Sequence, residues 1–593
     1  MPGMVNLKIN DINVSIESGS TILDAAKKAN IKIPTLCHHE DLCIAGNCRV
    51  CVVEQKGVNA LKASCATPVE DNMEIYTNTN KVREARKTII GLLLSEHNND
   101  CLHCYKNGNC ELQSIAKDYL VDSDKYISIL KDYEIDRSSP SIIKDDSKCI
   151  RCQRCVRTCA ELQDVNALTV SGKGSEMKIS TFMEKPMDYV VCTNCGQCVT
   201  HCPTGALVEK NYINEVWEAL NDPSKHVVVQ TAPAVRVGLG EAVGLEAGQS
   251  YTGKMVTALK MLGFDAVFDT NFSADLTILE EGSELLKRLK DKIENKKDVA
   301  LPQFTSCSPG WIKYIEHEFP DILDYLSTCK SPQQMLGPLA KTYYAKSMGI
   351  DPKDIIVVSI MPCTAKKFEA NRPEMYSSGY KDVDYVITTR EFGRMIQQAG
   401  IEFDTLKDSE CDSILGKHTG AGVIFGATGG VMEAALRTAY EIVTGREVPF
   451  SNLEVTPVRG LEGVKEATIK IEGCKTEWKF LEDVELKVAV AHGLANARPL
   501  AVQVQDGNSP YHFIEIMACP GGCIAGGGQP MPVNNEIRKK RTEAIYNEDE
   551  SLQFRKSHDN PEVKRIYENF LEKPLGHKSH ELLHTTYTRR KKY

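Results

Sequence analysis

The sequence has no apolar run that approaches the roughly 20 residues needed by a membrane-spanning helix, although 42% of its 593 residues are hydrophobic. Residues 1–10 lack both the charged-then-apolar pattern of a signal peptide and a twin-arginine signal. A net charge of -9 argues against a nucleic-acid partner. These absences predict a cytoplasmic chain without a membrane span.

Nucleotide-binding signatures are also missing. Gly238-Leu239-Gly240 has neither the third glycine in phase nor the acidic residue of a dinucleotide fingerprint, and no phosphate-binding loop is found. Flavin or NAD chemistry would therefore need partner subunits. The length predicts about four domains of roughly 150 residues each.

Cysteine, in contrast, is abundant and unevenly distributed. Of the 23 cysteines, sixteen lie between Cys37 and Cys202, and seven are spread over the remaining two thirds of the chain. A cytosolic compartment keeps thiols reduced, so disulfides are not expected. Clustered cysteines in such a compartment indicate metal binding.

Residues 1–80 are predicted to form a β-grasp domain like that of plant-type [2Fe–2S] ferredoxins. Residues 5–9 and 12–16 alternate apolar and polar side chains, as half-buried strands do, and Thr21 begins a capping-box pattern. A single cysteine, a CxxC pair and a distant fourth cysteine follow, although the first gap is longer than in that family. Zinc is the alternative, but all-cysteine zinc sites usually bring two CxxC pairs, and Cys43 is interpreted as a bystander. The predicted ligands are Cys37, Cys48, Cys51 and Cys65.

Residues 81–125 are predicted to hold a [4Fe–4S] cluster with mixed ligation. Residues 81–97 form one expected amphipathic helix, which delivers a histidine ahead of a CxxC pair and a further cysteine. His103 is the competing histidine, but its place inside the pair is expected to aim it away from the cluster. The apolar face of the helix comprises Val82, Ala85, Ile89, Leu92 and Leu93. The predicted ligands are His97, Cys101, Cys104 and Cys110.

Residues 140–210 carry two runs with the spacing Cys-x2-Cys-x2-Cys-x3-Cys. This is the spacing of the bacterial two-cluster ferredoxins, small α+β domains in which the fourth cysteine of each run ligates the other cluster. Paired zinc sites are the alternative, but the repetition favours two cubanes. One is predicted on Cys149, Cys152, Cys155 and Cys202, and the other on Cys192, Cys195, Cys198 and Cys159. Because protein ligands fill every site up to here, this region is predicted only to conduct electrons.

Residues 215–593 are predicted to form an α/β catalytic domain with parallel-type sheets, because apolar strands alternate with helical stretches. Several expected strand ends carry cysteine, methionine, proline or threonine. Ligands bind beyond the carboxyl ends of strands in α/β folds, so these ends are expected to converge on one pocket. The expected strands are 227–229, 355–360, 386–387, 422–425, 486–491 and 513–517.

The most distinctive stretch is Cys519-Pro520-Gly521-Gly522-Cys523. A tight turn can bring two such thiolates to the same side, where both face one iron–sulfur cluster. Five glycines between 521 and 528 remove side chains from one wall, so that a bulky non-protein group can approach. A simple loop is the alternative for this stretch taken alone.

These motifs resemble those of the [FeFe]-hydrogenases. Residues 361–369 match that family's MPCxxKxxE motif, residues 515–530 match ExMACxxGCxxGGGxP, and the four N-terminal cluster sites match in order. The resemblance implies reversible H2 oxidation and proton reduction at an H-cluster in a cleft flanked by two sheets. The H-cluster is a cubane joined through a cysteine sulfur to a two-iron unit with CO, cyanide and a bridging dithiolate.

The resemblance also implies the residues of that site. Cys363, Cys519 and Cys523 would hold the cubane, with Cys523 as the bridge. Lys366 would donate to a cyanide, which suits an ammonium facing an anionic ligand. Soft, apolar methionines would pack against the two-iron unit, although methionines in an ordinary core are the alternative. The other implied pocket residues are Ala232, Pro233, Gln333, Met361 and Met517.

One motif departs from the family. The family sequence is TSCCPxW, whereas residues 305–311 are TSCSPGW. The first cysteine of the family motif passes protons and the second ligates the cubane, so Cys307 is implied as proton donor and Ser308 takes a ligand position. Alternatively, Cys307 ligates and Ser308 handles protons, or the cubane has an oxygen ligand or an open corner. An inactive variant is a further interpretation.

The family's proton path is also implied. Glu281 and Glu284 share one face of an expected helix, Arg288 follows one turn later, and Ser327 comes from another segment. A buried Glu–Ser–Glu chain can relay protons. A solvated acidic helix is the alternative for these residues alone. Three further cysteines without cluster partners are predicted to be buried free thiols: Cys329, Cys411 and Cys474.

Two other functions are weighed against a hydrogenase. An electron-input subunit of complex I or of a formate dehydrogenase has a similar N-terminal half but lacks the two cysteine motifs after residue 360. An H2 sensor or an iron–sulfur assembly factor is the other alternative, although no signalling domain is visible. Residues 580–587 resemble the tail of the catalytic subunit of bifurcating NAD-linked hydrogenases. This implies flavin/NAD-binding and small iron–sulfur partner subunits, with a ferredoxin-only enzyme as the alternative, and maturation proteins to install the two-iron unit.

Overall fold

The computed structural model describes residues 3–121, 126 and 133–592. Its contacts divide the chain into two compact units. The first unit comprises Met1–Glu161, Asn166–Val190 and His201–Val208. The second unit comprises Leu162–Val165, Val191–Thr200 and Glu209–Tyr593.

The first unit begins with a five-stranded sheet of order β2-β1-β5-β3-β4. The hairpin of β1 and β2 pairs Leu7 with Val14, two side chains of a common apolar core. Thr21 caps α1 (Ile22–Lys28) and exchanges hydrogen bonds with Asp24, which confirms the predicted capping box. The strands are β1 (Met4–Ile9), β2 (Ile12–Glu17), β3 (Val52–Gln55), β4 (Lys62–Ala63) and β5 (Glu74–Tyr76).

The helix predicted at residues 81–97 is present as α2 (Asn80–Ser95), but its buried face differs from the predicted one. Leu92 is 51% exposed, whereas Arg86 is buried. The Arg86 guanidinium donates to the Val52 carbonyl at 2.8 Å and to the Tyr119 hydroxyl at 2.7 Å. These partners accept hydrogen bonds from two of the three guanidinium nitrogens. A polar side chain therefore takes part in the buried face, and a count of apolar positions leaves it out.

The rest of the first unit consists of short elements joined by cysteine-bearing loops. β6 (Ile142–Lys144) pairs with β9 (Leu207–Glu209), and β7 (Thr169–Ser171) pairs antiparallel with β8 (Lys178–Ser180). The helices of the cysteine-rich region are α3 (Glu111–Asp118) and α4 (Arg154–Arg157) in the first unit, and α5 (Gln197–His201), which except for His201 belongs to the second unit.

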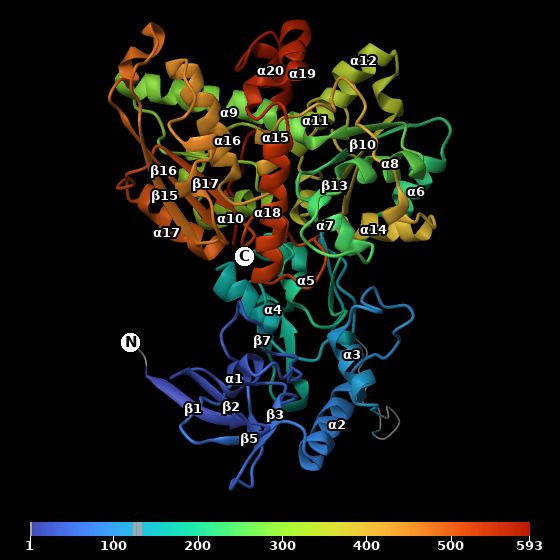
Figure 1. Ribbon diagram of the computed structural model, residues 1–593. Coiled ribbons are helices and arrows are strands. Elements are labelled where there is room, and N and C mark those ends of the chain that lie inside the picture. Colours follow the sequence, from blue (N-terminus) through green and yellow to red (C-terminus); the bar gives the residue numbers. More distant parts are fainter. Residues whose placement is uncertain (1–2, 122–125, 127–132, 593) are drawn as a thin grey trace. The chain divides into compact units, whose positions relative to one another are not determined.

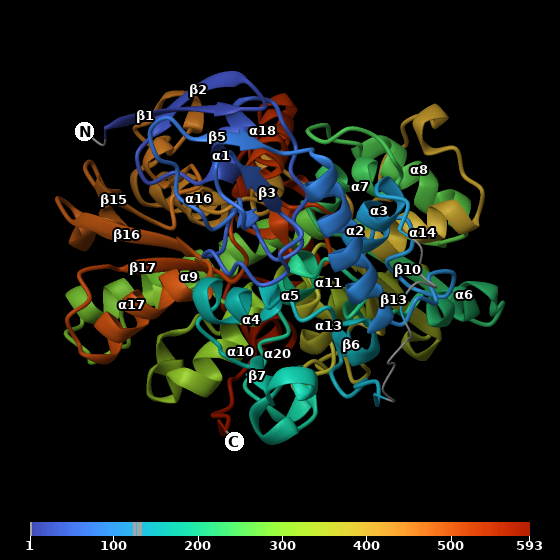
Figure 2. The ribbon, with the colours of Figure 1, turned by 90° about the horizontal axis from the view of Figure 1, so that it is seen from below.

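The second unit contains two four-stranded sheets, which Figures 1 and 2 show on opposite sides of this unit. The sheet of order β11-β10-β13-β14 is parallel throughout. The sheet of order β12-β17-β16-β15 is parallel except for its antiparallel edge strand β15. The strands are β10 (His226–Thr231), β11 (Ala266–Asp269), β12 (Gln303–Phe304), β13 (Ile355–Met361), β14 (Tyr385–Thr388), β15 (Val464–Lys470), β16 (Glu485–His492) and β17 (Phe513–Met517).

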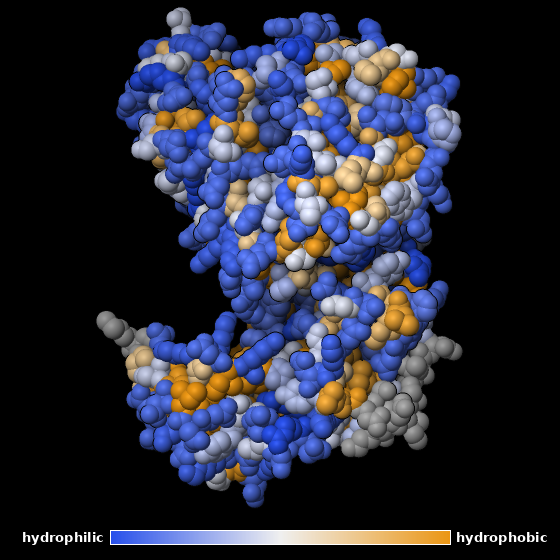
Figure 3. All heavy atoms as spheres, turned by 45° about the vertical axis from the view of Figure 1, so that its right-hand side comes forward, coloured by the Kyte–Doolittle hydropathy of each residue, from blue (hydrophilic) through white to orange (hydrophobic). Residues whose placement is uncertain are grey.

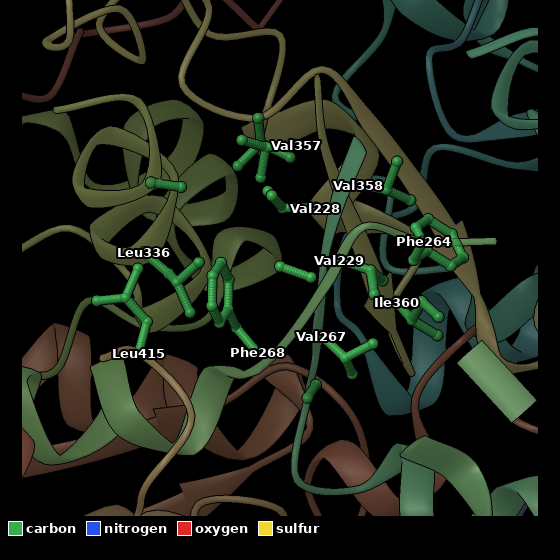
Figure 4. Packing of buried hydrophobic residues seen from close by; sticks show 14 of the residues in the cluster. Val228, Val229, Phe264, Val267, Phe268, Leu336, Val357, Val358, Ile360 and Leu415 are labelled. Carbon is green, nitrogen blue, oxygen red and sulfur yellow. The ribbon is translucent and has the colours of Figure 1, made fainter. Parts of the chain in front are cut away.

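Helices and apolar side chains cover these sheets. Val228 and Val357 come from neighbouring strands and are fully buried in one cluster with Phe268 and Leu336 (Figure 4). Strands buried on both faces have continuous apolar runs, which is why the sequence predicted them. The helices of this unit are α6 (Ile213–Asn221), α7 (Val235–Ala242), α8 (Thr252–Leu262), α9 (Thr270–Ile293), α10 (Pro309–Glu318), α11 (Pro332–Leu339), α12 (Ala345–Met348), α13 (Ala365–Glu369), α14 (Thr389–Gln398), α15 (Gly420–Ile424), α16 (Gly430–Thr444), α17 (Leu494–Gln505), α18 (Asn535–Ser551), α19 (Pro561–Ile566) and α20 (His577–Leu583).

One expected strand is wrong. Residues 422–425 do not form a strand, because most of them lie in the short buried helix α15. Gly422 packs against α9 so closely that a Cβ there would lie 2.6 Å from the Asn271 carbonyl oxygen. A short apolar run looks the same in a buried helix and a buried strand, so periodicity could not separate them. The other five expected strands lie within β10, β13, β14, β16 and β17.

The surface in Figure 3 is mostly hydrophilic, with hydrophobic residues scattered over it. Within the described residues, no helix is both long and apolar enough to cross a membrane. Of the three cysteines predicted as buried free thiols, Cys329 is buried, whereas Cys411 and Cys474 are partly exposed.

Candidate active site

A pocket lies in the second unit where strand ends of both sheets meet. It offers about 80 Å³ for the centres of water molecules, several times the roughly 10–15 Å³ that one water needs. Ala232 and Pro233 follow β10, and residues 361–363 end and follow β13. Residues 307–308 follow β12, and residues 517–519 end and follow β17. The expected strand ends therefore converge on one pocket, as ligand sites of α/β folds do.

The three cysteines predicted to hold the cubane, Cys363, Cys519 and Cys523, all line this pocket. Burial raises the pKa of each thiol, that of Cys523 to about 12. Buried thiols of this kind keep their protons until a bound cation replaces them, as ligating cysteines do. Their donor chemistry therefore fits an iron–sulfur cluster.

Glycines shape the wall beneath Cys519 and Cys523. Gly521 and Gly522 have φ angles of 84° and 94°, in the region that favours glycine. A Cβ at Gly522 would lie 2.7 Å from the Thr428 amide nitrogen. The turn therefore packs directly on backbone, which fixes the positions of the two cysteines.

Lys366 is held at the pocket wall by hydrogen bonds. Its ammonium donates to the Glu369 carboxylate at 2.9 Å and to the Cys307 carbonyl at 3.1 Å. Gln333 donates to the same carboxylate at 3.1 Å, while its buried Oε1 has no partner among the described residues. A charged donor and an unpaired amide oxygen, which is an acceptor, thus line the pocket, and the ammonium of Lys366 suits an anionic ligand. Sequence reasoning left Glu369 without a role, although its i,i+3 spacing from Lys366 was a signal.

Cys307 and Ser308 face different neighbours. Burial, followed by the charge of Glu281, raises the pKa of the Cys307 thiol well above its ordinary value. The Ser308 hydroxyl accepts the Ala518 N–H at 3.2 Å. The hydroxyl therefore lies beside the turn that carries Cys519, and the thiol lies beside a buried carboxyl group.

The four residues predicted as a proton path come together on and beside α9. Glu281 is buried, and its Oε1 accepts the Ser306 N–H at 3.3 Å. Burial, followed by the charge of Glu284, raises the pKa of Glu281 to about 8. Ser327 donates to Glu284 at 2.8 Å, and Arg288 donates to it at 2.7 Å. The four residues thus form a chain that leads away from the pocket.

Glu515 is a buried residue that the sequence left without a role. Its two carboxylate oxygens accept the N–H groups of Gly429 and Met432 at 2.7 Å each. Burial raises its pKa to about 7 despite these donors. Glu515 ties β17 to the start of α16, but its partners are distant in sequence and no local pattern indicated them. Cys195, assigned only to an accessory cubane, and Phe425 also line the pocket.

In the first unit, the four predicted [2Fe–2S] ligands lie together. The Cys51 and Cys65 sulfurs are 3.4 Å apart, and the Cys37 thiol is hydrogen-bonded to those of Cys48 and Cys65. Cys43 is exposed, and its thiol donates to a Glu161 carboxylate oxygen at 2.7 Å. That contact fits its interpretation as a bystander.

The two candidate histidines of the mixed-ligand site differ in burial. His97 is buried, burial lowers its pKa to about 4, and its Nδ1 has no partner among the described residues. His103 is exposed and pairs with Asp100 at 2.8 Å. A neutral imidazole is the form that binds metal, so the structure favours His97. Its predicted co-ligands include buried Cys110 and partly exposed Cys101 and Cys104.

The crossed ligation of the two predicted cubanes can be examined in part. Cys149, Cys152, Cys155 and Cys202 line one cavity of the first unit, although Cys202 comes from the second cysteine run. Burial raises the pKa of Cys149 and of Cys152 to about 12. Cys192, Cys195 and Cys198 are buried in the second unit, and Cys159 belongs to the first. The second cubane stays a prediction.

The catalytic unit matches known families. Residues 225–527 match the C-terminal domain of the iron only hydrogenase large subunit, and residues 535–590 match the iron hydrogenase small subunit. The NADP-reducing hydrogenase subunit HndD of Solidesulfovibrio fructosivorans is 50% identical over 99% of this chain and 100% of its own length. The chain belongs to the [FeFe]-hydrogenases. Iron hydrogenase 1 of Clostridium pasteurianum is 41% identical over 98% of this chain and 100% of its own. A solved variant of [FeFe]-hydrogenase HydA1 from Chlamydomonas reinhardtii is 44% identical, with a TM-score of 0.57, over 64% of this chain and 99% of that one.

The N-terminal part of this [FeFe]-hydrogenase matches three iron–sulfur models. They are a 2Fe-2S cluster binding domain at residues 3–80, an NADH-ubiquinone oxidoreductase-G iron-sulfur binding region at 86–125, and an NADH-quinone oxidoreductase subunit 3 ferredoxin-like domain at 139–208. The enzyme therefore carries [2Fe–2S] and [4Fe–4S] domains ahead of an H-cluster catalytic domain. Among these models, likeness to NADH oxidoreductases is confined to the N-terminal part, which disfavours the alternative of a pure electron-input subunit.

Proposed function

We propose that the protein catalyses reversible H2 oxidation and proton reduction in the pocket of the second unit. One [2Fe–2S] and three accessory [4Fe–4S] clusters carry the electrons. The observation that carries this proposal is a pocket lined by Cys363, Cys519 and Cys523, with Cys307 at its edge and the carboxyl of Glu281 beside that thiol. When bound, the H-cluster supplies the two-iron site at which H2 is split heterolytically.

Under this proposal the pocket residues divide into ligands and walls. Cys363, Cys519 and Cys523 would hold the cubane, and Cys523 would be the ligand shared with the two-iron unit. Lys366, already fixed by Glu369, would offer its ammonium to an anionic ligand such as cyanide. Ala232, Pro233, Gln333, Met361 and Met517 form the surrounding wall and exclude water.

Ser308 and Cys307 keep the roles that the family motif implies. The hydroxyl of Ser308 lies on the Cys519 side through its bond from the Ala518 N–H, so it takes the ligand position of the cubane. Cys307 has Glu281 as its main charged neighbour, so it exchanges the proton. The reverse assignment would place a hydroxyl, which is far less acidic than a thiol, at the start of the proton path.

The proton path then uses Glu281, Ser327 and Glu284, with Arg288 at the outer end. A carboxyl with a pKa of about 8 is protonated at neutral pH and can both donate and accept. The Ser327 hydroxyl donates to Glu284 and can pass a proton onward by rotating. Arg288 holds Glu284 in place through a salt bridge of 2.7 Å.

Each of four regions of the chain binds its own cluster or clusters, and the enzyme works with partner proteins. Residues 1–80 bind the [2Fe–2S] cluster, 81–125 the mixed-ligand [4Fe–4S] cluster, 140–210 the two cubanes and 215–593 the H-cluster. The likeness to a protein named as a subunit of an NADP-reducing hydrogenase supports work in a complex. We expect flavin/NAD-binding and small iron–sulfur partner subunits, a ferredoxin partner, maturation proteins and a cytoplasmic location.

Infrared spectroscopy of anaerobically matured protein, under H2 and then under CO, tests the proposal. Metal-bound CO and CN bands that shift with H2 are expected, together with H2 evolution from a reduced electron donor. Absence of these bands in protein that holds its accessory clusters would refute the proposal and leave only an electron-transfer role.

A further inference from the structure

The outer end of the proton path needs a group that can release a proton, and Arg288 is not such a group. A guanidinium does not deprotonate in proteins. Arg288 donates to Glu284 at 2.7 Å, to the Leu326 carbonyl at 2.8 Å and to the Asp324 carbonyl at 3.1 Å. These bonds give it a holding role. The Glu284 side chain is only 10% exposed, so another neighbour can help it to exchange its proton with solvent.

That neighbour is supplied by the C-terminal segment. One ring nitrogen of His584, the Glu284 carboxylate and the Cys329 sulfur all lie within 4.8 Å of one another. One bridging water can span such a gap between nitrogen and oxygen. His584 Nδ1 lies 2.7 Å from the Thr328 hydroxyl, and the His584 side chain is only 5% exposed. The imidazole is therefore held in place close to the outer end of the proposed proton path.

His584 also has the surroundings that a proton carrier needs. Its Nε2 lies 3.3 Å from Glu280, a buried carboxylate that also accepts the Tyr567 hydroxyl and the Leu575 N–H. Burial opposes ionisation of Glu280, but its hydrogen bonds, first that with His584, hold its pKa below its usual value. The His584 imidazole therefore lies close to two carboxyl groups, those of Glu280 and Glu284.

A second histidine connects His584 with the solvent-exposed surface. His580, one turn earlier on α20, is exposed, and its ring centroid lies 4.3 Å from that of His584. Burial, followed by the neighbouring His584, lowers the pKa of His580. The charged or titratable groups facing this route are Glu280, Glu284, Lys287, Arg288, Cys329, Tyr567 and Tyr587.

We propose that His584 and His580 form the outlet that carries protons between Glu284 and solvent. The Glu284 carboxyl gives its proton to one ring nitrogen of His584, and the other ring nitrogen releases a proton toward His580 and water. H2 oxidation uses this direction, and H2 evolution reverses it. The inference rests on the proposed function and adds two residues from the part of the chain that matches the small subunit.

His584→Gln tests the outlet, because glutamine keeps polar contacts but does not take up or release a proton near neutral pH. Turnover of H2 in both directions is expected to fall about 10²-fold, the lower end of what one proton-transfer group contributes. The KM for H2, the iron content and the infrared bands should stay as in the parent. Added imidazole should restore part of the rate, which a merely structural role would not allow.

Two further variants keep the test decisive. His580→Gln leaves the buried residues untouched and should slow turnover only in dilute buffer, with recovery as buffer concentration rises. His577→Gln, an exposed change on the same helix, should match the parent. A parent-like rate and pH profile in His584→Gln, or a loss that imidazole does not restore, would overturn the outlet. A parent protein without H2 turnover would instead refute the proposed function.

Discussion

At the scale of the residue, the chemistry depends on how burial sets the acidity of single groups. Glu281→Gln keeps the shape of the side chain but removes its exchangeable proton, so H2 turnover should fall about 10²-fold or more. Metal content and infrared bands should be unchanged. Glu294→Gln at the exposed end of α9 is the matched control and should behave as the parent. Equal rates for the Glu281 variant and the parent would exclude Glu281 from the path.

The pKa of Glu281 also predicts a pH dependence. Its pKa is about 8 in the folded protein, against an ordinary value of 4.5. The protonated donor therefore persists at neutral pH and is lost as pH rises through about 8, so H2 evolution should decline there. The stability that the neutral carboxyl contributes has the same sign: it is complete below about 4.5 and lost as pH rises through 8. Rates measured from pH 4 to 10 test this, and a decline centred near 4.5 instead of near 8 would contradict it.

Cys307 and Ser308 give a second residue-scale prediction. Cys307→Ala should abolish most turnover while the cubane remains, because the thiol moves protons and holds no iron. Ser308→Cys should retain turnover, because it supplies a thiolate at the ligand position. Electron paramagnetic resonance of the cubane, recorded beside H2 evolution, measures both. A cubane lost in Cys307→Ala but kept in Ser308→Ala would reverse the two roles.

Functional residues could be predicted from the sequence only where they lie in a short local motif. Cys363, Cys519 and Cys523 were predicted from motifs, and the structure brings them to one pocket. Glu515 lies in the same motif, yet its partners Gly429 and Met432 are more than eighty residues away. No local pattern could have revealed that bond, because the fold alone brings the two segments together.

At the scale of the element, the close packing of α15, which was predicted as a strand, against α9 can be tested by substitution. Gly422→Ala would place a Cβ 2.6 Å from the Asn271 carbonyl oxygen of α9, so backbone must move at a cost of about 1–3 kcal/mol. Gly282→Ala has no atom within 4 Å of the new Cβ and should instead stabilise α9 by about 0.5–1 kcal/mol. Thermal unfolding of the two variants should shift in opposite directions. Equal shifts would contradict the close contact between the helices.

Helices and strands were predicted correctly where a single local sequence pattern determines them. The capping box at Thr21 depends on residues three apart, and the continuous apolar runs of β10 and β13 follow from burial on both faces. The predicted buried face of α2 differs from the observed one because Arg86 is buried, where it donates to the Val52 carbonyl and the Tyr119 hydroxyl. These hydrogen bonds join residues distant in sequence, so the spacing of apolar residues along the helix could not predict them.

At the scale of the whole molecule, cluster ligands and sheet order differ in how far they can be read from sequence. Most ligands of each cluster are close in sequence, so their spacing identifies them. Sheet order depends on pairs such as Gln303 with Phe513, which join segments separated by most of the catalytic region. The types of cluster were therefore predictable and their number stays a prediction, whereas the arrangement of β12 beside β17 could not be read from the sequence.

The crossed ligation gives the last prediction. Cys202 shares a cavity with the three cysteines of the first run, although it belongs to the second. Cys202→Ser should therefore disturb the cubane of the first run, with its paramagnetic signal lost or altered and up to about four iron atoms missing. Infrared bands of the H-cluster should persist, since its ligands lie elsewhere, while electron transfer to external acceptors should slow. Cys43→Ser, at an exposed thiol bonded to Glu161, is the matched control and should keep all its iron. An intact first cubane in Cys202→Ser would show that each run holds its own cluster, and the electron route inferred from the two runs would then have to be redrawn.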